Sequence, residues 1–321
     1  MEGLVLNSPL RQKEVMILDG GLSSQLSAYV DGIDDDPLWT ARSVVKNPEA
    51  VTKAHMDFID AGARVVLTDS YQISCEGFQK YLEMDRKGTL DAVKSSVRLA
   101  RSAVRQSGIL PAEVLVGGSV GPYGACQHDG SEYTGVYLET MSREELVTWH
   151  TPRIQAFVEA GVDFIAAETL PSWREAVAVL DCLAATAAFL PVWVSFTLSN
   201  ADELPTRESL RDAIRHVRNH ELFAKGRVFG LGVNCCHPDL VGAALDNIRA
   251  VVKTTPLVVY PNSGEIWNGT SRDWEGQPVE WDTYVKSWLS RGVAVVGGCC
   301  RTRAHAISKL RLSVAKALLD T

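Results

Sequence analysis

Two pairs of adjacent cysteines are the residues in this sequence best suited to chemistry. Cys235 and Cys236 follow one short apolar run, and Cys299 and Cys300 follow another. Thiolates are soft ligands that favour zinc over magnesium, and a zinc site with three protein ligands leaves a fourth position for water or substrate. We therefore predict a Zn²⁺ site built from Cys235, Cys299 and Cys300.

The first pair leaves the identity of its ligand open. Adjacent residues on a regular strand point to opposite faces, so Cys235 and Cys236 should not both enter one site. Cys236 or His237 is therefore an alternative to Cys235, and the spacing alone does not choose among the three.

The second pair can act together only where its strand gives way to a turn. Gly297 and Gly298 directly precede Cys299 and Cys300, and they favour such a bend. Two other interpretations are inert, buried thiols and a disulfide between neighbours. The disulfide is disfavoured because it would close a strained ring.

Composition and charge narrow the class of protein. The chain has 321 residues, a net charge of −7 and no basic cluster, so nucleic acid is not an expected partner. Neither a signal peptide nor an apolar stretch long enough to cross a membrane is evident. The odd cysteine count of 7 then predicts reduced thiols and a cytoplasmic location. The sequence makes no prediction of the oligomeric state.

Short apolar runs, each followed by a helical pattern, recur along the whole chain. Continuous apolar runs are typical of strands buried on both faces of a parallel sheet. The pattern predicts a (β/α)8 TIM barrel forming a single domain over residues 1–321, with an open doubly wound sheet as the alternative. The predicted strands cover residues 16–21, 65–70, 114–120, 164–170, 192–198, 229–234, 257–262 and 294–298.

Local signals predict several helix boundaries. Ser142 with Glu145, and Ser172 with Glu175, have the spacing of a capping box at the start of a helix. Pro152 predicts that the first of these helices kinks or restarts. The last helix is expected to start at Thr302.

Polar residues gather where the predicted strands end. The active sites of barrel enzymes lie at that carboxyl end, so this coincidence predicts an enzyme. The residues are Asp19, Thr68, Asp69, Ser70, Ser119, Glu168, Ser195, Thr197, Asn234, Cys235, Asn262, Cys299 and Cys300.

An ordered set of motifs resembles the homocysteine S-methyltransferase family, and specifically its branch that uses S-methylmethionine. The set spans nearly the whole chain, and the Asn-Cys and Gly-Gly-Cys-Cys-Arg segments are its most specific parts. The matching segments are 19–21, 25–26, 36–39, 68–72, 118–125, 131–135, 168–172, 232–235 and 297–301.

The resemblance implies a (β/α)8 barrel that holds zinc through Cys235, Cys299 and Cys300, which selects one of the alternatives above. It also implies that carboxylates hold the ammonium of homocysteine and that a hydroxyl and nearby backbone hold its carboxylate. The implied homocysteine-binding residues are Asp19, Gly20, Gly21, Thr68 and Glu168.

The chemistry expected of such a site is methyl transfer to a thiolate. Zinc deprotonates a bound thiol, so homocysteine sulfur would attack the methyl group of a sulfonium donor and form methionine. The donor would be S-methylmethionine or S-adenosylmethionine, and betaine is less favoured. Aromatic faces can hold a sulfonium cation. The candidate donor-binding residues are Trp39, Tyr71, Gln72, Glu132 and Tyr133.

Two alternatives to this function stay open from the sequence. Within the same family, selenohomocysteine or selenocysteine is a possible acceptor. From a different class, the chain could be a non-catalytic zinc-sensing or redox-sensing barrel, although Asp19 and Glu168 speak against it.

Overall fold

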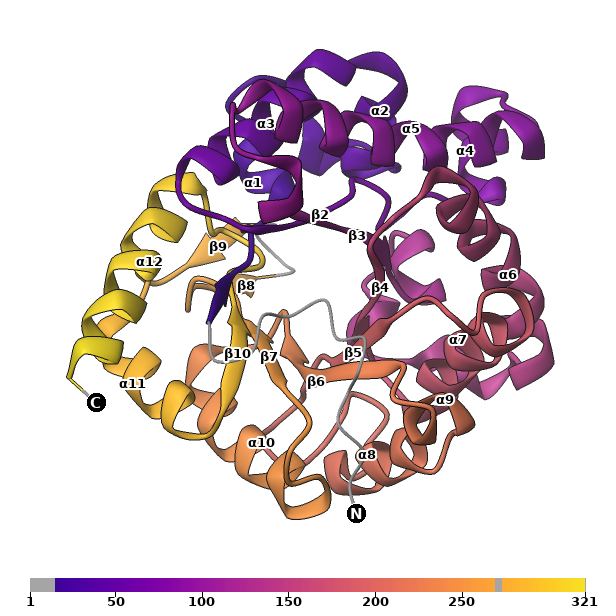
Figure 1. Ribbon diagram of the computed structural model, residues 1–321. Helices are drawn as coiled ribbons and strands as arrows, with labels where there is room; N and C mark the ends of the chain where they lie inside the picture. The colour runs from indigo at the N-terminus through magenta and orange to yellow at the C-terminus, as the bar shows by residue number, and fades with distance from the viewer. Residues whose placement is uncertain (1–14, 269–272, 321) are drawn as a thin grey trace.

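Eight parallel strands form one sheet whose two edges meet. A computed structural model describes residues 15–268 and 273–320. The strand order is β1-β10-β7-β6-β5-β4-β3-β2. A parallel bridge between Leu18, which follows β1, and Val65 of β2 joins the two ends of this order. Figure 1 shows the resulting ring of strands with the helices outside it. The sheet is therefore a (β/α)8 barrel, as predicted, and the open-sheet alternative is wrong.

All eight predicted strands are present in the described residues. Several end earlier than predicted because the polar residues that follow the apolar run leave the sheet. Their bounds are β1 Met16–Ile17, β2 Val65–Leu67, β3 Leu115–Val120, β4 Phe164–Leu170, β5 Val192–Phe196, β6 Val228–Asn234, β7 Leu257–Tyr260 and β10 Val293–Val296. The predicted domain bounds of 1 and 321 lie outside the described residues and stay a prediction.

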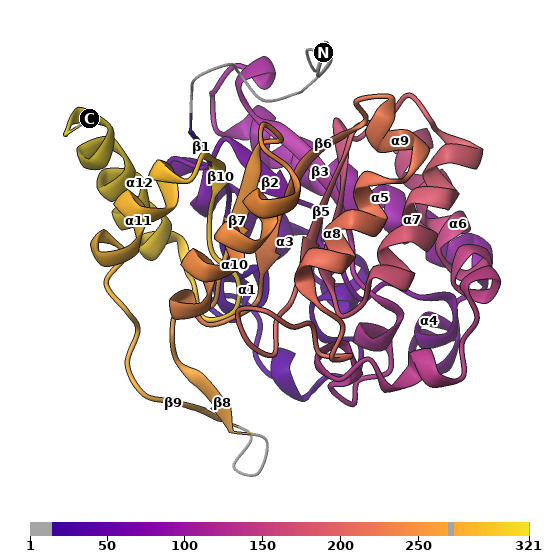
Figure 2. The same ribbon diagram turned by 90° about the horizontal axis from the view of Figure 1, so that it is seen from below.

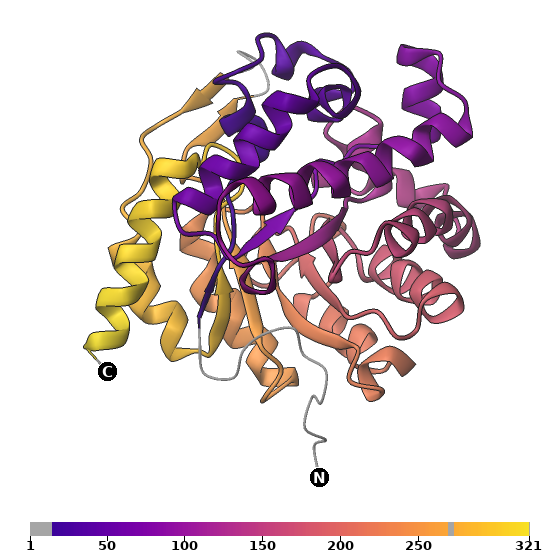
Figure 3. The same cartoon turned by 45° about the horizontal axis from the view of Figure 1, so that its top comes forward.

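Helices surround the barrel in chain order. Figure 3 shows the yellow α12 beside the indigo α3, so the last helix packs against an early one and completes the outer layer. The helices are α1 Leu22–Leu26, α2 Ser43–Lys46, α3 Pro48–Asp60, α4 Cys75–Leu82, α5 Arg86–Gln106, α6 Arg143–Ala160, α7 Trp173–Thr186, α8 Leu210–Arg218, α9 Glu221–Ala224, α10 Pro238–Val251, α11 Asp282–Ser290 and α12 Ala304–Leu319.

Some connections carry structure of their own. A hairpin of β8 Ile266–Asn268 and β9 Asp273–Glu275 projects away from the barrel between β7 and α11 (Figure 2). The loop between β3 and α6 contains three 3-10 turns, at Tyr123–Cys126, Ser131–Tyr133 and Val136–Glu139. We call residues 121–141 the β3 loop and residues 68–74 the β2 loop.

The core has two layers, as expected for a barrel. Inward-facing side chains such as Phe164, Trp193 and Phe229 fill the barrel interior, where the Phe164 and Trp193 ring centroids lie 4.6 Å apart. A second and larger apolar layer lies between the strands and the helices. The barrel interior is therefore packed with side chains.

Three of the predicted helix signals differ in part from the structure. Helix α6 runs through Pro152 without restarting, because side chains on both sides of it, such as His150 and Ile154, are buried. The capping box at Ser142 is confirmed, but Ser172 caps α7 alone, through Arg174 N–H. Glu175 instead is buried beneath the β3 loop, where it accepts from Tyr123 N–H, and α12 begins at Ala304 rather than Thr302.

No helix in the described part of the chain combines the length and the apolar character that a membrane crossing requires.

Candidate active site

Three cysteine sulfurs converge at the carboxyl end of the barrel. Cys235 directly follows β6, and Cys299 and Cys300 follow β10. Their three sulfur atoms lie within 4.8 Å of one another, and the Cys235 and Cys300 sulfurs are 3.7 Å apart. The structure therefore brings together the three cysteines that the sequence singles out.

The turn after β6 separates the two neighbouring cysteines. Cys235 has a φ of 49°, in the left-handed region that non-glycine residues rarely adopt. Its side chain faces the sulfur cluster, whereas Cys236 lies in the apolar layer outside the strands, where burial raises its thiol pKa to about 12. The His237 ring caps α10 through Asp239 N–H and contacts Gly264 O at 3.1 Å. Neither alternative ligand reaches the cluster.

Gly298 fits the second cysteine pair against β1. Its N–H donates to Asp19 O at 3.0 Å, and a Cβ at this position would lie 2.2 Å from Thr302 Cγ2. The left-handed backbone conformation of this turn falls later, at Arg301 with a φ of 64°. Gly298 is therefore needed because its backbone lies too close to the Thr302 side chain for a Cβ to fit, in addition to the bend that the sequence suggests.

The redox state of the cluster differs from the expectation. Cys235 and Cys299 are joined by a disulfide, although the sequence predicts reduced thiols. Convergence on one point explains this, because it brings the two sulfurs within bonding reach of each other. Since metal binding requires thiolates, the reduced form is the one that can hold an ion.

The donor set fits a tetrahedral metal ion. With zinc–sulfur bonds of about 2.3 Å, two sulfurs on one tetrahedral ion are about 3.8 Å apart. The Cys235–Cys300 separation of 3.7 Å agrees with this value, whereas the disulfide-bonded sulfurs of Cys235 and Cys299 would have to separate on reduction. Burial, followed by the charge of Glu132, raises the pKa of the Cys300 thiol to about 12. A thiolate at this position therefore needs a cation beside it.

The cluster lies at one side of a pocket rich in carboxylates. Four acidic side chains line it, and the described lining residues include no Lys, Arg or His. The described lining is Asp19, Gly20, Gly21, Leu22, Ser23, Trp39, Thr40, Leu67, Thr68, Asp69, Tyr71, Ser119, Glu132, Tyr133, Glu168, Thr169, Cys235, Tyr260, Gly298, Cys299 and Cys300. Such a pocket favours ligands that carry positive charge.

Asp19 and Glu168 are the two buried carboxylates that the sequence assigns to an ammonium group. One Asp19 oxygen accepts from Leu67 N–H at 2.8 Å, and Glu168 accepts from the Ser119 hydroxyl. Burial raises the pKa of Glu168 to about 7, and burial followed by repulsion from Glu168 raises the pKa of Asp19 well above its usual value. A bound cation would relieve both effects.

Thr68, Gly20 and Gly21 also line the pocket. The Thr68 hydroxyl accepts from Ser119 N–H at 3.0 Å and lies 2.7 Å from the Ser70 hydroxyl, which itself donates to Ser119 O. The Thr68 hydrogen is therefore directed at Ser70, and contact with a carboxylate would require it to rotate.

Four of the five predicted donor-binding residues line the pocket. The Trp39 and Tyr71 rings meet edge to face at 6.4 Å, and the Tyr133 hydroxyl donates to the Cys235 sulfur at 3.6 Å. Glu132 Oε2 is buried without a hydrogen-bond partner among the described residues, and burial raises the pKa of this carboxyl to about 7. Gln72 lies outside the lining and donates to Ala125 O at 2.8 Å.

Asn234 holds a strained turn beside Glu168. Thr169 has a φ of 57°, which is unusual for a β-branched residue. Its N–H donates to Asn234 Oδ1 at 2.8 Å, and Asn234 Nδ2 donates to Thr169 Oγ1 at 2.7 Å. Strain that surrounding contacts enforce is common at functional sites. The clamp fixes the end of β4 against the end of β6, next to Cys235.

Several lining residues were not predicted as site residues, and Tyr260 and Asp69 are the two that bear most on the chemistry of the pocket. Tyr260 ends β7, lies 2.7 Å from the Ser195 hydroxyl and hydrogen-bonds Glu168. The one sequence signal for a role of Tyr260 in the pocket is its spacing of two residues from Val258, which places both side chains on the inward face of the strand. Asp69 has one buried oxygen without a partner among the described residues, and burial raises the pKa of this carboxyl to about 7. Its place at a strand end was noted, but not its entry into the pocket.

Comparison with known proteins decides the family. The sequence profile described as homocysteine S-methyltransferase matches residues 16–314. The chain belongs to the homocysteine S-methyltransferase family. It is 41% identical over 302 residues to the betaine-homocysteine S-methyltransferase of Drosophila melanogaster, covering 90% of this chain and 91% of that one. It is 35% identical over 319 residues to the homocysteine S-methyltransferase of Escherichia coli, covering 95% and 98%.

Solved structures in the family have the same fold. The homocysteine methyltransferase MmuM from Escherichia coli, in its metallated form, superposes with a TM-score of 0.81 at 34% identity, covering 95% of this chain and 99% of that one. Its oxidized form gives a TM-score of 0.82 at 34% identity with the same coverage. The barrel and the assignment as a methyltransferase that acts on homocysteine are thereby confirmed.

Proposed function

We propose that the protein transfers a methyl group from S-methylmethionine to homocysteine in a zinc-dependent reaction that yields two molecules of methionine. One observation carries the proposal: three converging thiols border a pocket lined by four carboxylates and, in the described lining, by no basic side chain. The pocket suits two amino acids that each carry an ammonium group, one of which is also a sulfonium.

Cys235, Cys299 and Cys300 would hold the zinc ion in their reduced state. When bound, zinc acts as a Lewis acid that lowers the pKa of a thiol, which makes homocysteine sulfur nucleophilic near neutral pH. The Tyr133 hydroxyl, which donates to the Cys235 sulfur, would reduce the negative charge of the thiolate cluster.

Asp19 and Glu168 would bind the ammonium group of homocysteine. Both are buried and both have raised carboxyl pKa values, so a cation between them offsets an existing electrostatic cost. The backbone at Gly20 and Gly21, with Thr68, would receive the carboxylate. This anchoring would direct the thiol toward the three cysteines.

The aromatic rings of Trp39 and Tyr71 would hold the sulfonium. Glu132 Oε2, which has no hydrogen-bond partner among the described residues, would bind the donor's ammonium group. The substrate thiolate then forms a bond to the methyl carbon while the methyl–sulfonium bond breaks. The electron pair stays on the donor sulfur. The leaving group is a neutral thioether, so no side chain has to supply a proton.

Betaine is a second candidate donor, and the name of the Drosophila relative favours it. S-Methylmethionine carries an ammonium group in addition to its methyl-bearing cation, whereas betaine has only the quaternary ammonium. The free oxygen of Glu132, which lacks a partner in the part of the chain that the structure describes, therefore favours S-methylmethionine. S-Adenosylmethionine shares the sulfonium and the ammonium group. Selenohomocysteine would use the same pocket as homocysteine.

The decisive assay uses reduced wild-type protein, homocysteine and each donor in turn, with methionine measured with and without a zinc chelator. We expect turnover with S-methylmethionine that the chelator abolishes and added zinc restores. Full activity after complete metal removal contradicts the zinc role, and no methionine from any donor supports a non-catalytic sensor. Cys299→Ser should lose zinc, and metal retained in this variant argues against the ligand set.

A further inference from the structure

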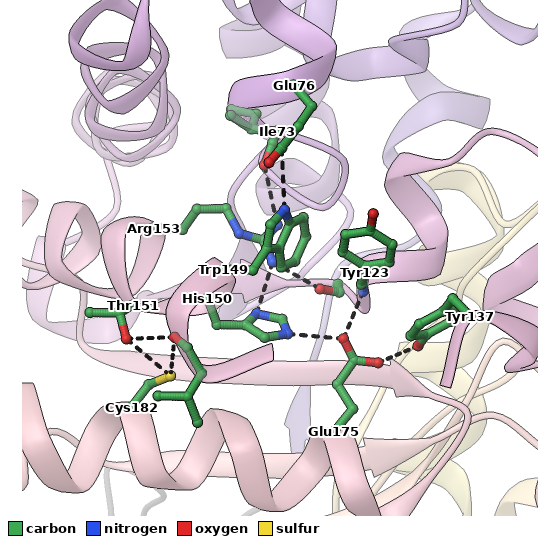
Figure 4. Close-up of polar contacts among 12 residues, drawn as sticks. Ile73, Glu76, Tyr123, Tyr137, Trp149, His150, Thr151, Arg153, Glu175 and Cys182 are labelled. Carbon is green, nitrogen blue, oxygen red and sulfur yellow. Dashed lines mark hydrogen bonds and ion pairs between the residues drawn. The ribbon is translucent and has the colours of Figure 1, made fainter. Parts of the chain in front are cut away.

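A charged cluster lies buried behind the pocket, outside the barrel strands. It consists of His150 and Arg153 on α6 and Glu175 on α7, with exposed fractions of 0%, 3% and 0%. Figure 4 shows the three side chains meeting between the helices and the β3 loop. None of them lines the pocket, and the proposed reaction gives them no role.

Glu175 holds the β3 loop at two points. Its Oε1 accepts from Tyr123 N–H at 2.7 Å, and its Oε2 accepts from the Tyr137 hydroxyl. Tyr123 and Tyr137 flank Glu132 and Tyr133, the two residues of this loop that line the pocket. One carboxylate therefore fixes the loop on both sides of its functional segment.

The contacts of His150 assign its tautomer. Arg153 Nη2 lies 2.9 Å from His150 Nδ1, and a guanidinium can only donate, so Nδ1 accepts. His150 Nε2 then carries the hydrogen and donates it to Glu175 Oε1 at 2.9 Å. The imidazole is neutral and bridges a buried cation to a buried anion. Burial lowers the pKa of this ring, as does the nearby positive charge of Arg153.

Arg153 connects the same cluster to the second loop. Its guanidinium donates to Ile73 O at 3.2 Å, in the β2 loop, and to Gly121 O at 3.2 Å, at the start of the β3 loop. Gln72 strengthens this junction by donating to Ala125 O. The β2 loop carries Tyr71, so the cluster holds both loops that supply most of the donor side.

Core stability alone does not account for this arrangement. A buried ion pair rarely adds more stability than well-packed apolar residues of the same volume. The backbone and hydroxyl groups that the cluster binds belong to the two loops, at Ile73, Gly121, Tyr123 and Tyr137. Within the described part of the chain, the side-chain hydrogen bonds of the cluster do not reach the three clustered cysteines, Asp19 or Glu168.

We propose that Glu175, His150 and Arg153 are positioning residues that set the donor half of the pocket through the β2 and β3 loops. The inference rests on the proposed function, because that function assigns Tyr71, Glu132 and Tyr133 to the methyl donor.

The test compares Glu175→Gln and Tyr137→Phe with wild type. The amide keeps the shape of the Glu175 side chain, but its NH2 group cannot accept a hydrogen bond as the carboxylate oxygen does. Tyr137→Phe removes the hydroxyl that donates to Glu175 from the β3 loop. We expect the KM for the donor to rise about tenfold in Glu175→Gln and about threefold in Tyr137→Phe. The KM for homocysteine and the zinc content should stay within twofold of wild type.

Glu208→Gln is the matched control. Glu208 also accepts hydrogen bonds at the start of α7, from the Ser172 hydroxyl at 2.9 Å and Trp173 N–H at 3.1 Å, and among the described residues its carboxylate has no hydrogen bond to either loop. Its substitution should leave both KM values unchanged. Equal rises in the two KM values of Glu175→Gln, or an unchanged donor KM in Glu175→Gln and Tyr137→Phe, overturn the proposal.

Hydrogen exchange separates this proposal from the proposed function. In Glu175→Gln we expect faster hydrogen exchange than in wild type in residues 68–74 and 121–141. The exchange rate of residues 294–302 should not change. Faster exchange throughout the chain overturns the positioning role, and if Glu175→Gln does not fold, Tyr137→Phe carries the same comparison. A wild-type protein that transfers no methyl group from any donor contradicts the proposed function, while the exchange pattern still tests the loops.

Discussion

At the scale of single residues, the charge of Glu168 should control homocysteine binding. The carboxyl has a pKa raised to about 7, so it is mostly ionised above that pH and mostly neutral below it. The affinity for an amino acid ammonium should therefore fall as the pH drops through about 7. We expect binding of 2-aminobutyrate, which lacks the thiol, to weaken several-fold between pH 8 and pH 6.

Inhibition constants measured against homocysteine would reveal this step, because 2-aminobutyrate has no thiol titration of its own. Glu168→Gln should bind the inhibitor more weakly and show a smaller step near pH 7, because Asp19, whose pKa is also raised, remains in the pocket. A pH-independent inhibition constant in wild type would contradict the role of Glu168.

Glu132 offers a second prediction at this scale, about the choice of donor. Its unpaired oxygen can bind an ammonium group that S-methylmethionine has and betaine lacks. Glu132→Gln should raise the KM for S-methylmethionine about tenfold, which corresponds to about 1.4 kcal/mol. Any turnover with betaine should change by less than twofold. Equal losses with both donors would argue that Glu132 acts on the loop rather than on the donor.

At the scale of elements, the sequence predicts those helices and strands that are determined by the pattern of neighbouring residues. The eight strands follow from continuous apolar runs, and the capping box of Ser142 follows from its spacing to Glu145. Ser172 and Glu175 have the same spacing, yet Glu175 turns inward. Its partners come from the distant β3 loop and from α6, and no local pattern encodes such contacts. The buried charge cluster was therefore beyond sequence reasoning.

The same limit applies to the site. Two thiol sites at strand ends must converge in a barrel, which predicts a cysteine cluster. The spacing leaves Cys236 and His237 as alternatives to Cys235, and only the family resemblance selects Cys235. Tyr260 was missed because it lies in an apolar run, and only its inward orientation brings its hydroxyl to Glu168.

The turn after β10 gives a prediction for this element. A Cβ on Gly298 would lie 2.2 Å from Thr302 Cγ2, so Gly298→Ala must shift the turn that carries Cys299 and Cys300. We expect at least tenfold weaker zinc binding and a loss of activity. Gly242→Ala is the control, because a Cβ there meets nothing within 4 Å and the site lies within helix α10. Zinc titration of both reduced variants measures the difference, and unchanged affinity in Gly298→Ala would contradict a rigid turn.

At the scale of the whole molecule, a metal ion would link elements that are distant in sequence. The proposed ligands follow β6 and β10, and the turn after β10 is bound to the segment after β1 through Gly298 N–H and Asp19 O. An ion held only by the folded barrel stabilises it by about 2.7 kcal/mol at a hundredfold excess over its Kd. Reduced wild-type protein should therefore gain roughly this free energy of unfolding with zinc.

The disulfide between Cys235 and Cys299 makes this effect dependent on the redox state. Protein kept oxidised has lost two of its three ligands, so zinc should leave its unfolding free energy unchanged until a reductant is added. Cys300→Ser, which keeps the other two cysteines, should show a much smaller gain when reduced. Denaturant unfolding measures the free energy of unfolding of the oxidised and the reduced protein, each with and without zinc. An equal gain in oxidised and reduced wild type would place the stabilising ion elsewhere on the barrel.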